Sequence, residues 1–254
     1  MTESRRRDTG GETGGALLLD FAGRHERIPA GESFVIGRGA DLSIDDNPYM
    51  HRRFLEIAAR GGMWWLRNVG SGLTASVASA DGLAQTWLAP GAGTPLVFAV
   101  TTVMFTAGDV TYELRLTAES PFYRSSHPWR SEADAEGVSE TLSPVQRILL
   151  TALAEPLLRR GGEGAVRLPS LAEVAVRLGW STEKVERRVG VLCGKFARLG
   201  IRGVERDARG ELPASACSRL VEHAVGARIV APDDLDLLDA FVAQDVEATR
   251  RPTG

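Results

Sequence analysis

Four basic side chains lie close together near the start of the chain. Arg38 follows a short apolar stretch, and His51, Arg52 and Arg53 follow a nearby acidic and polar segment. A phosphorylated side chain carries about −1.5 to −2 charges and three acceptor oxygens, so it is bound best by converging donors, above all arginine. A protonated imidazole also donates from both ring nitrogens. These four residues therefore predict a binding site for a phosphate group or another anion.

Acidic residues next to this group offer a second interpretation. Asp41, Asp45 and Asp46 lie between the two basic stretches. In this interpretation Arg38 and Arg52 form ordinary surface ion pairs with these carboxylates, which contribute little to stability. The residue types alone leave both interpretations open.

A second basic group lies on a predicted helix that Ser181 caps. Lys184, Arg188 and Lys195 are four and seven residues apart, so they share one face of that helix. Such a face suits the phosphates of double-stranded DNA, while residues at the start of the helix approach base edges in the major groove. The residues predicted to contact DNA are Ser181, Thr182, Lys184, Arg187, Arg188 and Lys195.

The charge balance around this helix is compatible with DNA binding but also with a solvated helix surface. Residues 164–210 contain ten basic and five acidic side chains, which gives the segment a net charge of +5. Glu183 and Glu186 lie on the predicted helix itself and oppose DNA binding. In the alternative interpretation the helix is a solvated surface with pairs such as Glu183–Arg187.

No pattern of residues indicates catalysis. The chain has no phosphate-binding Walker loop, no GxSxG and no HExxH, and its four histidines lack metal-ligand spacing. We therefore expect a non-enzymatic protein without a metal or cofactor. Cys193 and Cys217 lie in apolar helical stretches, which favours reduced, buried thiols and a cytoplasmic location.

Short β-rich stretches separated by turns fill the first half of the chain. Of the 254 residues 43% are apolar and the net charge is −3, values typical of a soluble globular protein. Such a succession of strands and turns predicts an all-β sandwich over residues 15–118. Tyr112, Leu114 and Leu116 alternate along one strand and should share its buried face. The predicted strands are 16–21, 33–37, 54–59, 63–68, 102–107 and 111–117.

The second half of the chain has helical periodicity. Ser143 and Ser170 each begin a capping box with Gln146 and Glu173, and Gly179 fits the end of the second helix. Further helices are predicted near 214–225 and 233–247, with a short strand and turn at 204–213. We therefore expect a helical domain at 141–248, joined to the sandwich by a linker at 119–140. Residues 1–14 are predicted to be a disordered tail and residues 249–254 a C-terminal tail, and no stretch is apolar enough for a membrane span.

Three separated motifs in the first half resemble a known recognition module. The order of Gly37-Arg38, then residues 51–54, then residues 64–72 is similar to the forkhead-associated (FHA) family. The resemblance implies a β-sandwich that binds a protein partner, with threonine phosphorylation of that partner as the usual requirement. The partner-binding residues that it implies are Arg38, His51, Arg52, Arg53, Asn68 and Ser71.

Three positions depart from the family pattern. His51 stands where the family has a phosphate-binding serine, and Phe54 stands where it has a structural histidine. Leu73 replaces the asparagine whose amide holds the main chain of the bound peptide. The resemblance therefore implies the fold more firmly than it implies phosphothreonine binding, and a phosphate-independent surface is the alternative.

The helical half resembles a second kind of module. Glu173-Val174-Ala175, followed by Ser181 and the phrase at 195–200, is similar to the helix-turn-helix domains of sigma-like and LuxR-type regulators. The two resemblances together imply a transcriptional regulator that reads a protein partner with one domain and DNA with the other. The alternative is a signalling or scaffold adaptor in which both domains bind protein. A homodimer fits either interpretation.

Overall fold

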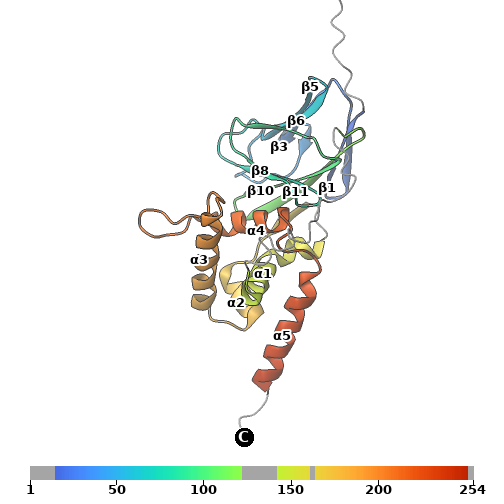
Figure 1. Cartoon of the computed structure of the whole chain (residues 1–254). Coiled ribbons are helices and arrows are strands. Elements are labelled where there is room, and N and C mark those ends of the chain that lie inside the picture. Colours follow the sequence, from blue (N-terminus) through green and yellow to red (C-terminus); the bar gives the residue numbers. More distant parts are fainter. Residues whose placement is uncertain (1–14, 122–141, 161–163, 251–254) are drawn as a thin grey trace, which may run out of the picture.

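The computed structural model describes residues 15–121, 142–160 and 164–250. A β-sandwich forms one end of the molecule and five helices form the other (Figure 1). The predicted tail at 1–14 lies outside the described residues, as do nearly all of the predicted linker and its aromatic residues Phe122, Tyr123 and Trp129.

Two sheets build the sandwich. The larger one has the strand order β2-β1-β11-β10-β7-β8, and the smaller one has the order β4-β3-β5-β6-β9. The strands of the larger sheet are β1 (Leu17–Phe21), β2 (Arg24–Ile28), β7 (Ala75–Ser79), β8 (Gln85–Leu88), β10 (Val100–Ala107) and β11 (Val110–Ala118). Those of the smaller sheet are β3 (Ser33–Gly37), β4 (Leu42–Ser43), β5 (Leu55–Arg60), β6 (Met63–Asn68) and β9 (Gly93–Pro95).

Alternating apolar residues from both sheets fill the space between them. Tyr112, Leu114 and Leu116 are all buried in this core, as the alternation along β11 predicts. Phe105 on β10 stacks on Tyr112 with ring centroids 5.1 Å apart, and Phe54 meets Phe105 edge-on at 4.7 Å. The N-terminal β-sandwich expected from the sequence is confirmed.

Five helices form the C-terminal region, and their ends follow the capping signals. Ser170 and Glu173 form the predicted capping box, and Gly179 ends its helix in the left-handed conformation at φ 64°. Residues 204–213 contain no strand, so that part of the prediction is wrong. The predicted turn is present and is closed by a backbone hydrogen bond from Asp207 to Glu211. The helices are α1 (Pro144–Arg160), α2 (Leu171–Leu178), α3 (Thr182–Arg198), α4 (Ala216–Gly226) and α5 (Asp234–Arg250).

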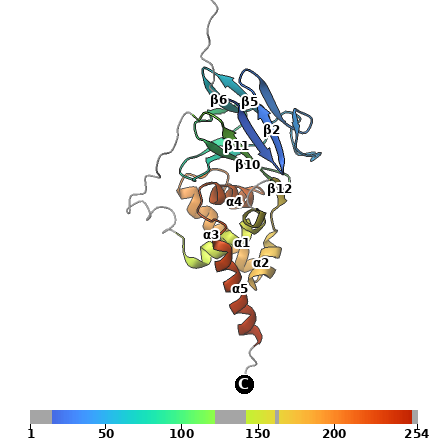
Figure 2. The same ribbon diagram turned by 90° about the vertical axis from the view of Figure 1, so that its right-hand side faces the viewer.

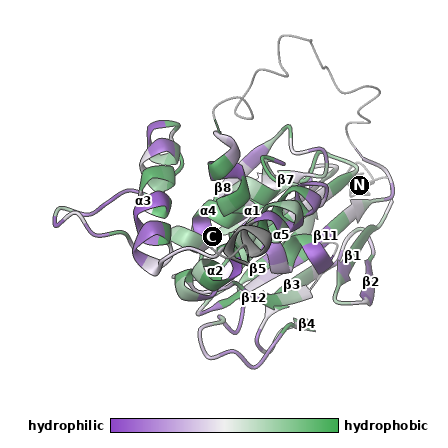
Figure 3. Cartoon of the chain, turned by 90° about the horizontal axis from the view of Figure 1, so that it is seen from below, coloured by the Kyte–Doolittle hydropathy of each residue, from purple (hydrophilic) through white to green (hydrophobic). Residues whose placement is uncertain are grey.

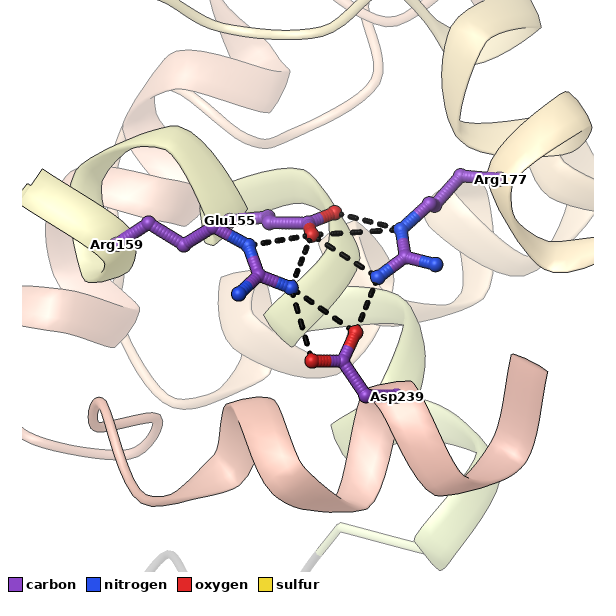
Figure 4. Close-up of polar contacts among 4 residues, drawn as sticks. All are labelled: Glu155, Arg159, Arg177 and Asp239. Atoms are coloured by element: carbon purple, nitrogen blue, oxygen red, sulfur yellow. Dashed lines mark hydrogen bonds and ion pairs between the residues drawn. The ribbon is translucent and has the colours of Figure 1, made fainter. Parts of the chain in front are cut away.

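Four charged residues join three of these helices (Figure 4). Glu155 of α1 accepts hydrogen bonds from Arg177 of α2, and Arg159 donates to both Glu155 and Asp239 of α5. Arg177 is also paired with Asp239. Burial alone would raise the pKa of Glu155, but the bonds from Arg177 and Arg159 lower it. The network holds α5 against α1 and α2, while the far end of α5 projects from the body (Figure 2).

The two halves of the chain share a sheet. Strand β12 (Gly164–Arg167), which lies between α1 and α2, pairs antiparallel with β11 and places Ala165 opposite Tyr112. Helix α4 lies across the outer face of the same sheet, against β7 and β10 (Figure 1). The sandwich and the helices are therefore joined by backbone hydrogen bonds as well as by side-chain packing.

Several other features bear on function. Within the described ranges no helix is long and apolar enough to cross a membrane. The same residues contain no cluster of histidine, cysteine or carboxylate side chains that would hold a metal ion. Cys193 is buried and Cys217 is half-buried, and both are free thiols. Burial raises the pKa of Cys193 to about 11, which makes it a poor nucleophile at neutral pH.

Candidate functional site

The two basic stretches of the sandwich meet at the end of β3. The backbone N–H of Arg38 donates to the carbonyl of His51 at 2.9 Å. A Cβ atom at Gly37 would lie only 2.4 Å from the carbonyl oxygen of Arg52, so glycine alone permits this close approach. The approach brings the segments of Arg38 and of His51-Arg52-Arg53 side by side.

His51 lies over the loop at residues 70–74. Its Nε2 atom accepts hydrogen bonds from the backbone N–H groups of Gly72 at 3.0 Å and Leu73 at 3.4 Å. A Cβ atom at Gly70 would lie 2.7 Å from Cδ2 of the ring, so the ring rests directly on the backbone there. An imidazole that accepts at Nε2 carries its hydrogen on Nδ1. His51 therefore offers one N–H donor, at Nδ1, to a ligand. The residue type alone would allow donation from both ring nitrogens, but Nε2 is occupied as an acceptor.

Asn68 holds the same loop from beneath. Its side chain is buried; its amide nitrogen donates to the carbonyls of Leu73 at 2.8 Å and Leu88 at 2.9 Å, and its oxygen accepts from Gly70 at 3.0 Å. Asn68 thus positions the loop rather than facing solvent. Ser71 is exposed at the tip of the loop, where its hydroxyl is accessible.

The three arginines at this site have no partner among the residues that the structure describes. Arg52 and Arg53 are exposed and Arg38 is half-exposed, and none of these side chains forms a described hydrogen bond or ion pair. The alternative ion pairs with nearby acids are absent from the same residues. Asp41 instead accepts from the backbone N–H of Val35 at 2.8 Å.

A buried tyrosine anchors the loop that leads to His51. The hydroxyl of Tyr112 donates to Asp45 at 2.7 Å and accepts from the amide of Asn47 at 2.9 Å. Asn47 also donates to the carbonyl of Ala107 at 2.9 Å. Burial is the main cause that raises the pKa of Tyr112 to about 12, so the hydroxyl stays a donor. The segment that precedes His51 is therefore anchored to the core at Asp45 and Asn47, which lowers the conformational cost of binding.

The basic residues of the helical half lie on and beside α3. Helix α2 ends at Gly179, and Ser181 caps α3 by accepting from the N–H of Lys184 at 3.2 Å, so three residues separate the two helices. Lys184 places its ammonium 4.1 Å from the ring centroid of Trp180, and the Arg188 guanidinium lies 5.4 Å from it. These two cations are held on an aromatic face.

Other predicted residues of α3 are open to solvent. Thr182 and Arg187 are exposed, and Lys195 is half-exposed. The predicted pair between Glu183 and Arg187 is absent from the residues described, and neither Arg187 nor Lys195 has a described ion pair. Residues 181–198 therefore present a basic surface with Thr182 near its start.

A hydrophilic loop follows α3 and lies beside it (Figure 3). The Arg206 side chain crosses α3 at Gly190, where a Cβ atom would lie 2.4 Å from a guanidinium nitrogen. Asp207 accepts from the backbone N–H groups of Arg209 and Glu211 and closes the turn. Residues 202–211 carry three basic and three acidic side chains, so this loop extends the polar surface beside α3 without adding net positive charge.

Comparison with known proteins finds structural likeness only. No family description matches this chain, and no curated protein matches it. The crystal structure of Mycobacterium tuberculosis Rv1747 FHA-1 is 17% identical with a TM-score of 0.31, and the likeness covers 42% of this chain and 98% of that one. The FHA domain of an Arabidopsis thaliana hypothetical protein is 18% identical with a TM-score of 0.34, covering 50% and 99%.

A further likeness is to a structure that describes phosphothreonine-dependent FHA domain interactions. It is 22% identical with a TM-score of 0.30, and the likeness covers 41% of this chain and 98% of that one. In each case the matched share is about the length of the sandwich. The function of this chain must therefore be argued from its own residues.

Proposed function

We propose that the sandwich is an FHA-type module that binds an anionic segment of a protein partner at Arg38, Arg52 and Arg53. The observation that carries the proposal is the set of guanidinium groups that have no partner among the described residues and extend from a buried base. Arginine offers a planar fork of donors that matches phosphate and carboxylate oxygens. Nδ1 of His51 adds one donor beside them, and the exposed hydroxyl of Ser71 adds another.

The kind of ligand that fits the site depends on which backbone N–H groups remain available to it. The N–H groups of Gly72 and Leu73 are directed at His51, and Leu73 offers no side-chain amide to a bound main chain. Recognition therefore depends on charge more than on reading the peptide backbone. We expect a phosphothreonine to bind more tightly than a glutamate at the same position because it carries more charge and one more acceptor oxygen.

Peptides that differ only in one residue test this proposal. Phosphothreonine, glutamate and threonine versions of a peptide array should bind in that order, and Arg38→Gln should weaken the phosphothreonine version about 10- to 100-fold, as expected for one charge-assisted hydrogen bond. Arg60→Gln is the matched control, because Arg60 is an exposed arginine at the opposite end of β5. Equal binding of all three versions would show a charge-independent surface instead.

We further propose that α2, the intervening turn and α3 form a helix-turn-helix that binds double-stranded DNA. The observation that favours it is the exposed basic surface of α3. Thr182 and Arg187 lie where the first turns of such a helix approach base edges. Lys184 and Arg188 are held over Trp180, which suits them to phosphates rather than to bases.

Two neighbouring exposed positions give a matched test of DNA binding. Arg187→Gln removes a positive charge and Glu186→Gln removes a negative charge from consecutive residues of α3. In fluorescence anisotropy at low salt, the first variant should weaken binding of a random-sequence duplex and the second should strengthen it. The affinity of the wild-type chain should fall steeply as salt is added.

Together the two activities describe a non-enzymatic transcriptional regulator in which a protein partner acts through the sandwich. A wild-type chain that binds no duplex at low salt would instead leave an adaptor whose two halves both bind protein. A homodimer stays a prediction in either case.

A further inference from the structure

Helix α4 lies on a polar part of the larger sheet. Gly226 at its end approaches β8 so closely that a Cβ atom there would lie 2.7 Å from Nε2 of Gln85. Gln85 in turn donates to the hydroxyl of Ser76 at 2.7 Å and to the carbonyl of Glu222 at 3.3 Å. Contacts between the two halves of the chain are thus directional rather than purely apolar.

Glu222 is the buried centre of this contact. Its side chain is 1% exposed; Oε1 accepts from the hydroxyl of Thr106 at 2.7 Å, and Oε2 lies 3.3 Å from the guanidinium of Arg219. Burial raises the pKa of Glu222 to about 7, while the charge of Arg219 and the bond from Thr106 act in the opposite direction. The carboxylate therefore depends on Arg219 for its ionised form.

Arg219 contacts three parts of the molecule besides Glu222. Its guanidinium lies 5.0 Å from the ring centroid of Trp87 and donates to the carbonyl of Thr74 at 3.4 Å. Its aliphatic part faces Gly203, where a Cβ atom would lie 3.5 Å from Cγ. One side chain, 19% exposed, therefore joins α4, the sandwich and the segment that follows α3.

Thr74 is the last residue of the loop that forms the proposed partner site. The preceding residue, Leu73, is held by His51 through its N–H and by Asn68 through its carbonyl. The loop is thus fixed between the proposed anion site on one side and Arg219 on the other. A ligand that moved His51 would shift Thr74 relative to Arg219.

Gly203 lies at the start of the 202–211 loop beside α3. Its N–H is bonded to Glu205, and Arg206 then crosses α3 at Gly190. A change in the position of Arg219 would therefore shift the start of the 202–211 loop. Because Arg206 of this loop lies against α3, the shift would reach the proposed DNA-binding surface.

We propose that Arg219 and Glu222 form a junction that couples the 70–74 loop of the sandwich to the 202–211 loop beside α3. The proposal deepens the proposed function, since it names the route by which partner binding would regulate DNA binding. The physical reason is that one side chain cannot keep its guanidinium on Thr74 and Glu222 and its aliphatic part against Gly203 if one of these residues moves. Loss of one contact leaves a buried charge that must find another partner, so the arrangement favours two discrete states.

The test needs no ligand, so it stands whether or not the phosphopeptide and duplex bind. Gly70→Ala places a methyl group against His51 and so perturbs the 70–74 loop; Gly72→Ala, whose Cβ would lie 3.5 Å from Nε2 of His51, is a milder version. Hydrogen exchange of the backbone amides at 203–211 is measured for each change, alone and combined with Arg219→Gln. Arg67→Gln supplies a matched background, because Arg67 is a half-exposed sandwich arginine paired with Glu56.

We expect Gly70→Ala to change the exchange rates of the amides at 203–211 by at least about threefold in the wild-type and Arg67→Gln backgrounds. In the Arg219→Gln background the same change should leave these rates unaltered. Gly72→Ala should act in the same sense with a smaller effect, which covers the case in which Gly70→Ala fails to fold. No change at 203–211 in any background, or the same change in all of them, would overturn the proposal. If the junction responds as expected and phosphopeptides do not bind, only the proposed ligand is wrong.

Discussion

Replacing Glu222 by glutamine should remove a specific part of the pH dependence of stability. The pKa of this carboxyl is raised by burial from 4.5 to about 7 in the folded chain. Between these values the folded chain holds a proton that the unfolded chain has lost, so the free energy of unfolding falls as pH rises from 4.5 to 7. A difference of about 2.5 between two pKa values corresponds to about 3 kcal/mol.

The neighbouring His223 acts in the opposite direction over a similar interval. Burial lowers its pKa to about 4, so the folded chain keeps it neutral while the unfolded chain takes up a proton below about 6.5. The free energy of unfolding therefore falls as pH drops from 6.5 to 4. The wild-type profile contains both slopes, but the difference between wild type and Glu222→Gln cancels the contribution of His223.

Guanidinium chloride unfolding at pH 8 and at pH 4.5 measures that difference. The free energy of unfolding of Glu222→Gln minus that of wild type should be about 3 kcal/mol larger at pH 8 than at pH 4.5. The reason is that glutamine keeps the acceptor for Thr106 and carries no charge. Glu186→Gln, an exposed position on α3, is the control and should change stability similarly at both pH values. A difference under about 1 kcal/mol for Glu222→Gln, with unchanged denaturant slopes, would refute a carboxyl whose pKa is raised by burial at this junction.

Three further substitutions test the packing of the site and of the helices. Gly37→Ala should lower the free energy of unfolding by about 1–3 kcal/mol in denaturant melts, because its Cβ would meet the carbonyl of Arg52; wild-type stability would contradict the close approach. Asn68→Ala should cost about 1–3 kcal/mol by leaving buried backbone groups unpaired, and thermal melts should show it alongside faster exchange of the Gly70 amide. Arg177→Gln should lower stability by about 1 kcal/mol at low salt and by less in 1 M NaCl, since its partners are partly exposed; an effect independent of salt would argue against an ion-pair network.

Local signals in the sequence predicted the helix ends and six of the twelve described strands. Capping residues such as Ser170 and Gly179 act on backbone groups a few residues away, so their effect is visible in the sequence itself. The alternation at 111–117 likewise identified which side chains face the core. The arginines at 38, 52 and 53, which we propose bind an anion, were also singled out by residue type, and the structure leaves them unpaired among its described residues.

Contacts between distant residues could not be predicted in the same way. The strand β12 is four residues long, and its partner on β11 lies far away in the sequence, so no periodicity reveals the pairing. Thr106 and Glu113 alternate with core residues and would be expected to face water, yet Glu113 is only 6% exposed. Because α4 covers that face against β7 and β10, polar residues there are buried. Asn68 was predicted to contact the partner, and only the geometry shows that it positions the loop.

The pairing of β12 with β11 has a practical consequence for dividing the chain. A fragment that ends at residue 118 would lose β12 and expose the hydrogen-bonding edge of β11 at 110–113. A strand of another molecule can then pair with this edge. Such a fragment should self-associate or aggregate, and a sandwich prepared for partner binding needs residues 164–167 restored, for example by a short tether. In the intact chain two molecules could exchange their β12 strands across this edge. We therefore expect a concentrated preparation to contain some domain-swapped dimer.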